Sequence, residues 1–524
     1  MNYLKVEDLT LEQKLGMLLC ARRWDEQEDI DFTFELLKNH ALGSIQIPRD
    51  ENTAKLIKKI KEAADYPVLI IADMERGYPL CDLPKVTALS LAACATEEHY
   101  KAYARGIVKY AKGDGLSGTW CPVVDILRVN KPASSARCYG DTPEKVINAA
   151  EIVMKVFLEN GFFGTGKHYP GGLDQPYDSH MVETPCYLTE EELTEFDIAP
   201  YVELNKKGLL PAVMTRHCVY HNIDPNYPAT LSKKMLGILR DKGFDGVYFT
   251  DSLAMMGILQ KYGEENAYGI CVDAGIDNIL TNYRTPTKKC YEMLKNCYEK
   301  GMFSEERLNE AVRHVLALQK WVGEHADTEP VFTEKDRMLL ESVTKDCITA
   351  VCDEGLSADI GDPDKRRLFV IVTPMDFDDN AIAMEIDDGD WYKPIALSKH
   401  IKETFPNAEI AFIPEYQTAK QNEELLVKAT SHDEVVFMTY CQMACYLGTD
   451  GLTRRCEALI DCLNISGKVS AVVHFGNPFA MEPLEHVKRI IFGYSSTESQ
   501  KYAVDVLAGK IAAKGKMPLK LNLK

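Results

Sequence analysis

The segment 167–180 concentrates side chains that can transfer protons and bind polar ligands. Lys167-His168-Tyr169-Pro170-Gly171 is followed at short range by Asp178-Ser179-His180. An amine, two imidazoles and a carboxylate in one loop-rich stretch have no use in a hydrophobic core, so they predict a polar pocket. A second acidic signal, Asp251, ends the apolar run 246–250. Together the two signals predict a site with separate positions for proton transfer and for nucleophilic attack.

These residues need a scaffold, and the hydrophobic pattern indicates repeated β/α units. Short apolar runs alternate with longer amphipathic stretches, as in a parallel sheet with helical connections. Apolar residues recur at helical spacing over 142–160 and 231–242, which predicts helices there. Seven candidate strands lie in the first part of the chain, each with polar residues at or just past its carboxyl end: 42–47, 68–72, 118–124, 165–168, 210–214, 247–250 and 276–280.

Such strands could close into a barrel or stay open as a doubly wound sheet. Chemistry-capable residues follow many of them, whereas an open sheet would concentrate such residues at one switch point. No GxGxxG fingerprint follows the first strand either. We therefore expect an α/β protein with an N-terminal (β/α)8 TIM-type barrel over residues 1–325. A linker over 326–334 would lead to a smaller C-terminal α/β sandwich domain over 335–524, with apolar runs at 368–372, 410–413, 435–439, 469–475 and 487–492.

Composition restricts the partners. The formal net charge of −19 argues against a nucleic acid or an anionic membrane, because both require a basic surface. The N-terminal segment carries acids and lacks a continuous apolar run, so we expect a cytoplasmic protein. Its sixteen cysteines are scattered without CxxC pairs, which favours free thiols over disulfides.

Several motifs together resemble one known family. The stretch 167–180, KHYPGGLDQPYDSH, resembles a loop of family-three glycoside hydrolases, particularly the branch that acts as β-N-acetylglucosaminidases. Other motifs are similar to that family's barrel motifs and occur in the same order: Asp73-Met74-Glu75, Pro122-Val123-Val124-Asp125, 136–141 (ARCYGD), 213–217 (VMTRH) and 246–251 (GVYFTD). The resemblance spans roughly residues 5 to 320, and more loosely the second domain.

This resemblance implies roles for individual residues. Asp251 matches the catalytic nucleophile, and Asp178 with His180 matches the acid/base dyad of the N-acetylglucosaminidase branch. The residues that would hold the sugar are Asp73, Arg137, Lys167 and His168, to which we add the strand-end residues Arg216 and His217. Arg216 could instead pair with Asp73 or Glu75 to balance the charge of the site. No cofactor and no metal are expected.

The implied chemistry is consistent. Retaining cleavage of a glycosidic bond needs a carboxylate near the anomeric carbon and a proton donor on the leaving oxygen. An imidazole, with an unperturbed pKa near ~6.5, can donate that proton close to neutrality. Asp178 could accept the other ring N–H of His180 and stabilise the imidazolium. We therefore expect an exo-acting hydrolase that removes a terminal β-linked sugar, with N-acetylglucosamine as the first candidate, from a small carbohydrate.

Alternatives remain open at this stage. A histidine donor repels an anion less than a carboxylate does, so phosphate could replace water as the acceptor. Asp251 could cap a helix over 252–258, and Asp178 and His180 could be solvated turn residues. Oxygen and nitrogen ligands could instead bind a metal at His168, Asp174, Asp178 and His180. Two altered motifs, 171–174 (GGLD) and 75–78 (ERGY), also allow a sugar-binding protein that has lost catalysis.

Overall fold

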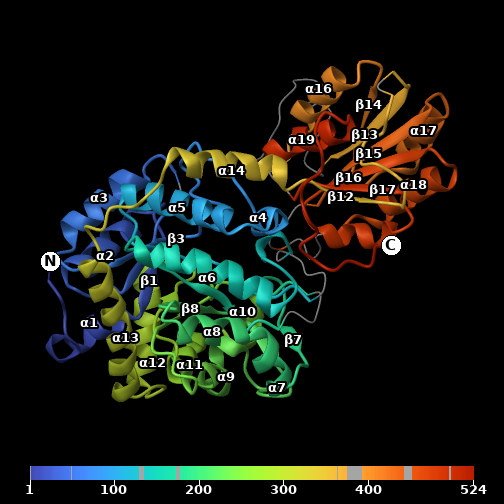
Figure 1. Cartoon of the computed structure of the whole chain (residues 1–524). Helices are drawn as coiled ribbons and strands as arrows, with labels where there is room; N and C mark the ends of the chain where they lie inside the picture. Colours follow the sequence, from blue (N-terminus) through green and yellow to red (C-terminus); the bar gives the residue numbers. More distant parts are fainter. Residues whose placement is uncertain are drawn as a thin grey trace. The chain divides into compact units, whose positions relative to one another are not determined.

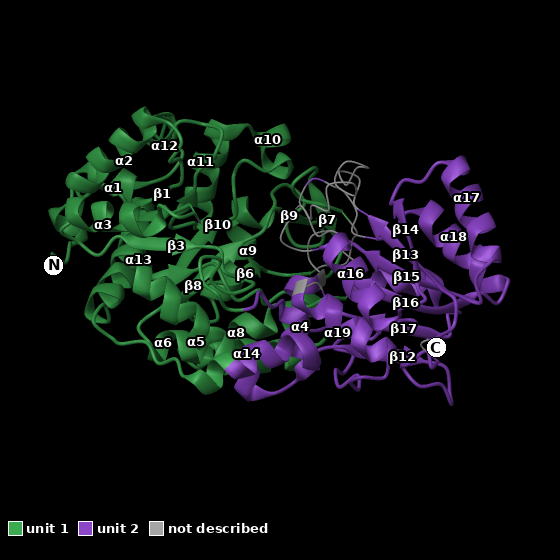
Figure 2. Cartoon of the chain, turned by 90° about the horizontal axis from the view of Figure 1, so that it is seen from above, with its two compact units in different colours: residues 1–83, 100–129, 141–337 green, residues 84–99, 130–140, 338–524 purple. Residues whose placement is uncertain are grey.

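The computed structural model describes residues 2–48, 50–128, 135–172, 177–362, 364–373, 392–441, 446, 451–494 and 497–523. The chain forms two compact units, drawn in green and purple in Figure 2. Unit 1 comprises Met1–Leu83, Tyr100–Val129 and Asp141–Arg337, and unit 2 comprises Pro84–His99, Asn130–Gly140 and Met338–Lys524. Unit 2 therefore takes two short segments from within the sequence of unit 1.

The strands of unit 1 are short, buried and parallel. A six-stranded sheet has the order β11-β1-β2-β3-β4-β5, and a three-stranded sheet has the order β10-β8-β6. Thr165 alone separates β5 from β6, and a parallel bridge between Phe249 and Asn278 connects β10 with the residue before β11. Pairings thus lead from β1 to β5, the chain continues through Thr165 into β6, and further pairings lead through β8, β10 and β11 back to β1. The strand bounds are Leu19–Ala21 (β1), Ser44–Gln46 (β2), Leu69–Ala72 (β3), Gly118–Thr119 (β4), Phe163–Gly164 (β5), Gly166–Tyr169 (β6), Ala212–Thr215 (β8), Val247–Thr250 (β10) and Ile279–Leu280 (β11).

Helices surround these strands in Figure 1, and their local signals agree with the sequence pattern. In α6, Thr142 caps the first turn and Pro143 occupies its first position. The apolar residues of 142–160 form its buried side, as predicted. The helices are α1 (Leu11–Met17), α2 (Gln27–Lys38), α3 (Thr53–Ala63), α5 (Glu97–Asp114), α6 (Pro143–Glu159), α7 (Glu190–Glu192), α8 (Ala199–Lys206), α9 (Lys233–Arg240), α10 (Met256–Tyr262), α11 (Glu264–Ala274), α12 (Thr287–Glu299) and α13 (Glu305–Glu324).

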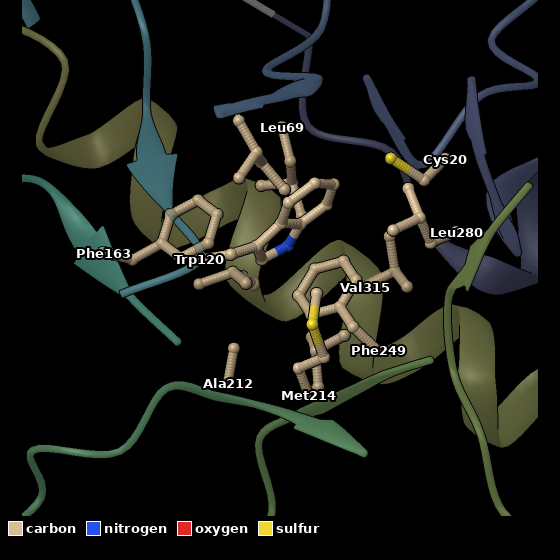
Figure 3. Packing of buried hydrophobic residues seen from close by; sticks show 12 residues of the cluster. Cys20, Leu69, Trp120, Phe163, Ala212, Met214, Phe249, Leu280 and Val315 are labelled. Carbon is tan, nitrogen blue, oxygen red and sulfur yellow. The ribbon is translucent and has the colours of Figure 1, made fainter. Parts of the chain in front are cut away.

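One apolar cluster joins the six-stranded and three-stranded sheets of unit 1 (Figure 3). Trp120 lies at its centre against the ring of Phe249, with the two centroids 6.4 Å apart in an edge-to-face arrangement. Strands far apart in the sequence supply the remaining members, and α13 adds two: Cys20, Leu69, Ile71, Phe163, Ala212, Met214, Val247, Leu280, Val315 and Leu318. Burial of these side chains, worth roughly 1.5–3 kcal/mol for each large one, holds the strands in place.

All seven predicted strands of this region contain observed strand residues, whereas β1 and β5 were not predicted. Strand β1 is only three residues long and directly follows the apolar end of α1, and β5 is only two residues long. In the predicted run 118–124 the observed strand is shorter than expected. Only β4 and a single bridge between Val123 and Lys167 form there. A separate two-stranded parallel sheet pairs β7 (Thr184–Cys186) with β9 (Cys218–Tyr220).

Unit 2 contains a six-stranded sheet of order β12-β17-β16-β15-β13-β14. Its strands are parallel except β12, which runs antiparallel to β17 at one edge. The predicted runs match β13 (Arg367–Thr373), β14 (Glu409–Pro414), β15 (Glu434–Tyr440), β16 (Val469–Phe475) and β17 (Arg489–Phe492), whereas β12 (Thr349–Cys352) was not predicted. Helices α16 (Pro394–Thr404) and α19 (Thr497–Leu507) lie on one face of the sheet, and α17 (Ala419–Thr430) and α18 (Arg454–Ile465) lie on the other (Figures 1 and 2). The predicted α/β class is confirmed.

The remaining elements of unit 2 include α4 (Ala88–Cys94), η2 (Ser135–Arg137) and most of α14 (Glu334–Asp346). Both Thr87 and Ser90 donate side-chain hydrogen bonds to the carbonyl of Tyr494, which ties α4 to the end of β17. Among the described residues, no helix combines the length and apolar character needed to cross a bilayer. The described cysteines form no disulfide with one another.

Candidate active site

The polar residues predicted for the site follow the strands of unit 1 at their carboxyl ends. Asp73 and Asp251 directly follow β3 and β10, Lys167 and His168 lie in β6, and Arg216 follows β8. Parallel strands place their carboxyl ends at the same edge, where loops assemble binding sites. The sequence order of these residues is therefore also their order around that edge.

Lys167 connects two carboxylates. Its ammonium nitrogen lies 2.7 Å from Oδ1 of Asp73 and 2.6 Å from Oε1 of Glu75, and the lysine side chain is only 3% exposed. Asp73 is 37% exposed, so part of its carboxylate faces solvent. This arrangement offers a sugar hydroxyl an acceptor at Asp73 whose position is fixed by the lysine.

Asp125 organises a second charged group. Its carboxylate accepts from the backbone N–H of His168 at 3.3 Å and lies 2.8 Å from Nδ1 of the same ring. A guanidinium nitrogen of Arg216 lies 3.5 Å away. Burial alone would raise the pKa of Asp125, but Arg216 and His168 together hold it below its usual value. The ionised carboxylate therefore orients the imidazole of His168.

Asp251 is a partly buried carboxylate with three imidazoles nearby. Its Oδ1 accepts from the backbone N–H of Ser252 at 2.7 Å. Burial favours the neutral acid, yet nearby His168, His217 and His180 outweigh it and lower the pKa of Asp251 below its ordinary value. A carboxylate that stays ionised can act as a nucleophile.

His217 supports the main chain beside Asp251. Its Nε2 lies 3.0 Å from the carbonyl oxygen of Ser252 and donates to it, while Nδ1 lies 2.9 Å from Oγ1 of Thr230. Burial lowers the pKa of His217, against an opposing effect of Asp251. Because both ring nitrogens already have protein partners, His217 fixes the turn that follows the carboxylate.

The loop that carries Asp178 and His180 is attached to the segment after Asp251. The carbonyl of His180 accepts from the N–H of Met256 at 3.1 Å, and the carbonyl of Ser179 accepts from the N–H of Gly257 at 3.4 Å. Nδ1 of His180 lies 2.7 Å from Oδ1 of Asp178, which also accepts from the backbone N–H of His180. The imidazole therefore has a carboxylate on one nitrogen and is held next to the start of α10.

The family follows from a direct comparison. Residues 10–318 match the model of the glycosyl hydrolase family 3 N-terminal domain. This chain belongs to glycosyl hydrolase family 3. The predicted resemblance is thus confirmed, and so is the predicted enzyme class, a glycoside hydrolase.

Proteins similar to this family 3 enzyme have names that refer to enzymes acting on β-linked sugars. It is 33% identical over 280 residues to a β-hexosaminidase of Neisseria gonorrhoeae, a match that covers 50% of this chain and 76% of the relative. A family 3 β-N-acetylglucosaminidase from Paenibacillus sp. str. FPU-7 is 27% identical with a TM-score of 0.81, covering 98% of this chain and 100% of that one. A β-glucoside phosphorylase bound to 2FGlc has a TM-score of 0.81 at 21% identity, covering 98% and 95%, and so shows a shared fold.

Two predicted residues are not placed in this group. Arg137 ends η2, which belongs to unit 2, so its contact with the sugar stays a prediction. Asp174, a member of the alternative metal set, lies outside the described residues. Within the described parts of the chain, no group of three or more histidine, cysteine and acidic side chains could hold a metal ion.

Three simpler interpretations fail on geometry. Helix α10 begins at Met256 and its N-cap residue, Met255, makes no side-chain bond, so Asp251 does not cap it. Asp178 is buried and paired, and is not a solvated turn residue. The alternative pairing of Arg216 with Asp73 or Glu75 is also wrong. Lys167 binds both of these carboxylates, and the guanidinium of Arg216 lies next to Asp125.

Sequence reasoning missed several contributors. Asp125 and Glu75 were recognised as part of motifs but were not predicted as site residues. Their positions just past strand ends, on the same edge as Lys167, were the available signal. No sequence pattern indicated Thr230 or Arg22. Thr230 contacts His217 and Arg22 contacts Ser252, and both contacts form only when separate segments of the chain fold together.

Proposed function

We propose that this protein is a retaining exo-glycosidase that removes a terminal β-linked sugar, with N-acetylglucosamine as the first candidate. Asp251 would attack the anomeric carbon, and His180 would protonate the leaving oxygen. The resulting glycosyl–Asp251 ester would then be attacked by water, with His180 now acting as the base. The names of the Neisseria and Paenibacillus relatives support the choice of sugar.

The observation that carries this proposal is the attachment of the His180 loop to the segment after Asp251. Two backbone hydrogen bonds, from Met256 and Gly257, hold the loop there. His180 is also close enough to Asp251 to lower the pKa of that carboxyl. A proton donor and a nucleophile held at one site are the two groups that double displacement requires.

The remaining polar residues support sugar binding. Asp73 follows β3, and Lys167 and His168 lie in β6, so together they would form one polar arc beside the nucleophile. A pyranose with its anomeric carbon above Asp251 would direct the hydroxyls of C2, C3 and C4 toward this arc. Asp178 would orient His180 and stabilise its protonated form during each proton transfer.

A covalent trap tests the nucleophile. Incubation with a 2-fluoro aryl β-glycoside slows both steps, and mass spectrometry of a protease digest should then find the sugar on Asp251. Aryl glycosides of N-acetylglucosamine and of glucose would be compared for the sugar preference. A label on any other residue would refute the assignment of Asp251.

Phosphorolysis is a second candidate on the same residues. A histidine donor is neutral after it gives up its proton, so it repels an incoming phosphate less than a carboxylate would. The fold shared with a β-glucoside phosphorylase is in line with this alternative. A phosphate titration with product analysis separates the two reactions, because sugar phosphate forms only by phosphorolysis and free sugar by hydrolysis.

We also propose that the cycle of strand pairings in unit 1 is the (β/α)8 barrel expected from the sequence. The layered sheet of unit 2 would be the α/β sandwich, joined through the linker at 326–334. Each strand of a barrel needs two neighbours, and the pairings and the bridge between Phe249 and Asn278 support this arrangement. The cytoplasmic location remains a prediction from the sequence.

A further inference from the structure

A cavity of about 810 Å3 lies at the carboxyl ends of β11, β1 and β2, outside the polar arc. Its walls combine basic, aromatic and amide side chains: Arg22, Trp24, Asn52, Lys55, Lys59 and Tyr283. We call it the β1–β2 cavity. All of its lining residues belong to unit 1. A cavity of this size has room for a substituent on a sugar.

Arg22 connects the β1–β2 cavity with the nucleophile. One of its guanidinium nitrogens donates to Oγ of Ser252 at 3.1 Å, and Ser252 directly follows Asp251. Burial lowers the pKa of Arg22, while Asp73 and Asp251 are both near enough to oppose this effect. The arginine therefore lies near both Asp251 and Asp73.

The order of the strands then indicates which part of a sugar faces the cavity. Around the edge, β3, β4, β6, β8 and β10 carry the polar arc and Asp251, while β11, β1 and β2 complete the circle. If C1 lies above Asp251 and the hydroxyls of C2 to C4 face the arc, the ring oxygen, C5 and C6 face the remaining strands. A group attached to C6 would therefore extend into the β1–β2 cavity.

The charges of the cavity favour a negative group. Three cations line it, Arg22, Lys55 and Lys59, against two acids, Asp25 and Asp50; Arg22 is partly buried, and the two lysines and both acids are exposed. Oδ1 of Asp50 already accepts from the backbone N–H of Asn52. The lining of the cavity has a net positive charge, although the whole chain has a net charge of −19. Binding of an anion would account for this difference.

The aromatic residues give this cavity a defined shape. The guanidinium of Arg22 lies 5.2 Å from the ring centroid of Tyr283, and that of Arg284 lies 4.6 Å from the same centroid. The indole N–H of Trp24 donates to the carbonyl of Gln46 at 2.7 Å. Arg22 is therefore held in place before a ligand arrives, which lowers the cost of binding a planar or tetrahedral oxyanion.

We propose that the β1–β2 cavity binds an anionic ester, phosphate or sulfate, on C6 of the sugar that the enzyme releases. This inference rests on the proposed function, because it takes the orientation of the ring from Asp251 and the polar arc. It also places the enzyme after a class of reaction that esterifies C6, such as phosphoryl or sulfuryl transfer to the primary hydroxyl.

The test compares four aryl β-glycosides of N-acetylglucosamine with C6 carrying hydroxyl, O-methyl, phosphate or sulfate. We expect one or both charged esters to exceed the O-methyl compound in kcat/KM by at least about tenfold, which corresponds to one charge-assisted contact. The double variant Lys55→Gln/Lys59→Gln should lose this preference while keeping turnover of the hydroxyl compound. Added salt should weaken the preference, because exposed lysines are screened.

Lys58→Gln is the matched control, since Lys58 is an exposed lysine of the same helix, α3, that does not line the cavity. It should keep the preference for the charged esters. Equal kcat/KM for the charged and O-methyl compounds would overturn the inference and leave the proposed function intact. If no glycoside is turned over, the proposed function fails; calorimetry with N-acetylglucosamine 6-phosphate and the lysine variants then tests the cavity separately.

Discussion

Histidines in the two units have different partners, and the partners determine what each ring can do. In unit 1, His168 and His180 each have a carboxylate at Nδ1, from Asp125 at 2.8 Å and from Asp178 at 2.7 Å. In unit 2, His474 lies between Oγ1 of Thr439 and the carbonyl oxygen of Asn477, both 2.9 Å away. Its neighbours are neutral, and burial lowers its pKa to about 4.

This difference in partners distinguishes the candidate active site of unit 1 from a structural histidine of unit 2. A carboxylate beside an imidazole stabilises the protonated ring, so that ring can gain and lose a proton during a reaction. A ring with only neutral partners in a dry core stays neutral and serves as a hydrogen-bonding spacer. Both units have parallel sheets with polar residues near strand ends, so the sheet alone does not identify the active site.

If charge distinguishes the unit 1 site, neutralising Asp251 should have the largest effect. We expect Asp251→Asn to lower kcat/KM for aryl glycosides by roughly 10^4-fold or more, because an amide cannot form the glycosyl ester. Initial rates of aryl release measure this loss. Asp241→Asn, which changes an exposed carboxylate of the same unit, serves as the control and should keep wild-type rates. Near wild-type activity in Asp251→Asn would contradict the proposed chemistry.

The next largest effect should come from the dyad. His180→Ala should lower kcat/KM by roughly 10^3-fold for substrates with poor leaving groups, and far less for activated aryl glycosides that depart without a proton. A plot of log kcat/KM against leaving-group pKa should therefore become steeper. His40→Ala removes another His–Asp pair, an exposed one at 2.6 Å from Asp65, and should not change the slope. An equal loss on all substrates would count against His180 as the donor.

A smaller loss is expected at Lys167. The variant Lys167→Met leaves Asp73 and Glu75 next to each other without their shared cation, so Asp73, the carboxylate proposed to bind the sugar, loses its position. We expect kcat/KM to fall by about 10^2-fold. Lys145→Met, which removes an exposed lysine 2.7 Å from Asp141, is the matched control. If Lys167→Met and Lys145→Met behave alike, the Lys167 bridge has no role in substrate binding.

His474→Gln should leave kcat/KM unchanged and affect only stability. Folding lowers the pKa of His474 from an ordinary 6.5 to about 4, so the unfolded chain binds the proton more tightly. The free energy of unfolding should therefore fall as pH drops from about 6.5 toward 4, by up to about 3 kcal/mol from this residue. Chemical denaturation of wild type and variant at pH 7.5 and 5 measures the difference.

In that comparison the free energy of unfolding of His474→Gln should lack the decrease that His474 causes at low pH. The difference in unfolding free energy between wild type and variant should therefore become smaller as pH falls. His486→Gln, which changes a more exposed histidine 2.8 Å from Asp461, is the control and should keep the part of the pH dependence that His474 contributes. A constant gap between wild type and His474→Gln at both pH values would show that the ring does not titrate as proposed.

Much of the fold could be predicted from local pattern. The run 469–475 became β16 over those same residues, since a buried parallel strand reads as a continuous apolar segment. Helix α6 followed from its Thr142 cap, its proline and its apolar stripe. In contrast, β1 and β12 were missed, because a three-residue strand and an edge strand have too little local signal. The Lys167–His168 peptide bond is cis, which no sequence rule for a residue other than proline indicates.

The sequence by itself determined the residue types of the site, the order of the strands that carry them and the family to which the chain belongs. These features depend on chemical identity and on short-range pattern, both of which a linear chain contains. Only the tertiary structure decided that Lys167 holds Asp73 and Glu75, that Arg216 turns to Asp125, and that Arg22 reaches Ser252. Such pairings depend on distances between segments that meet only after the strands pack, and a buried charge takes the nearest partner that packing provides.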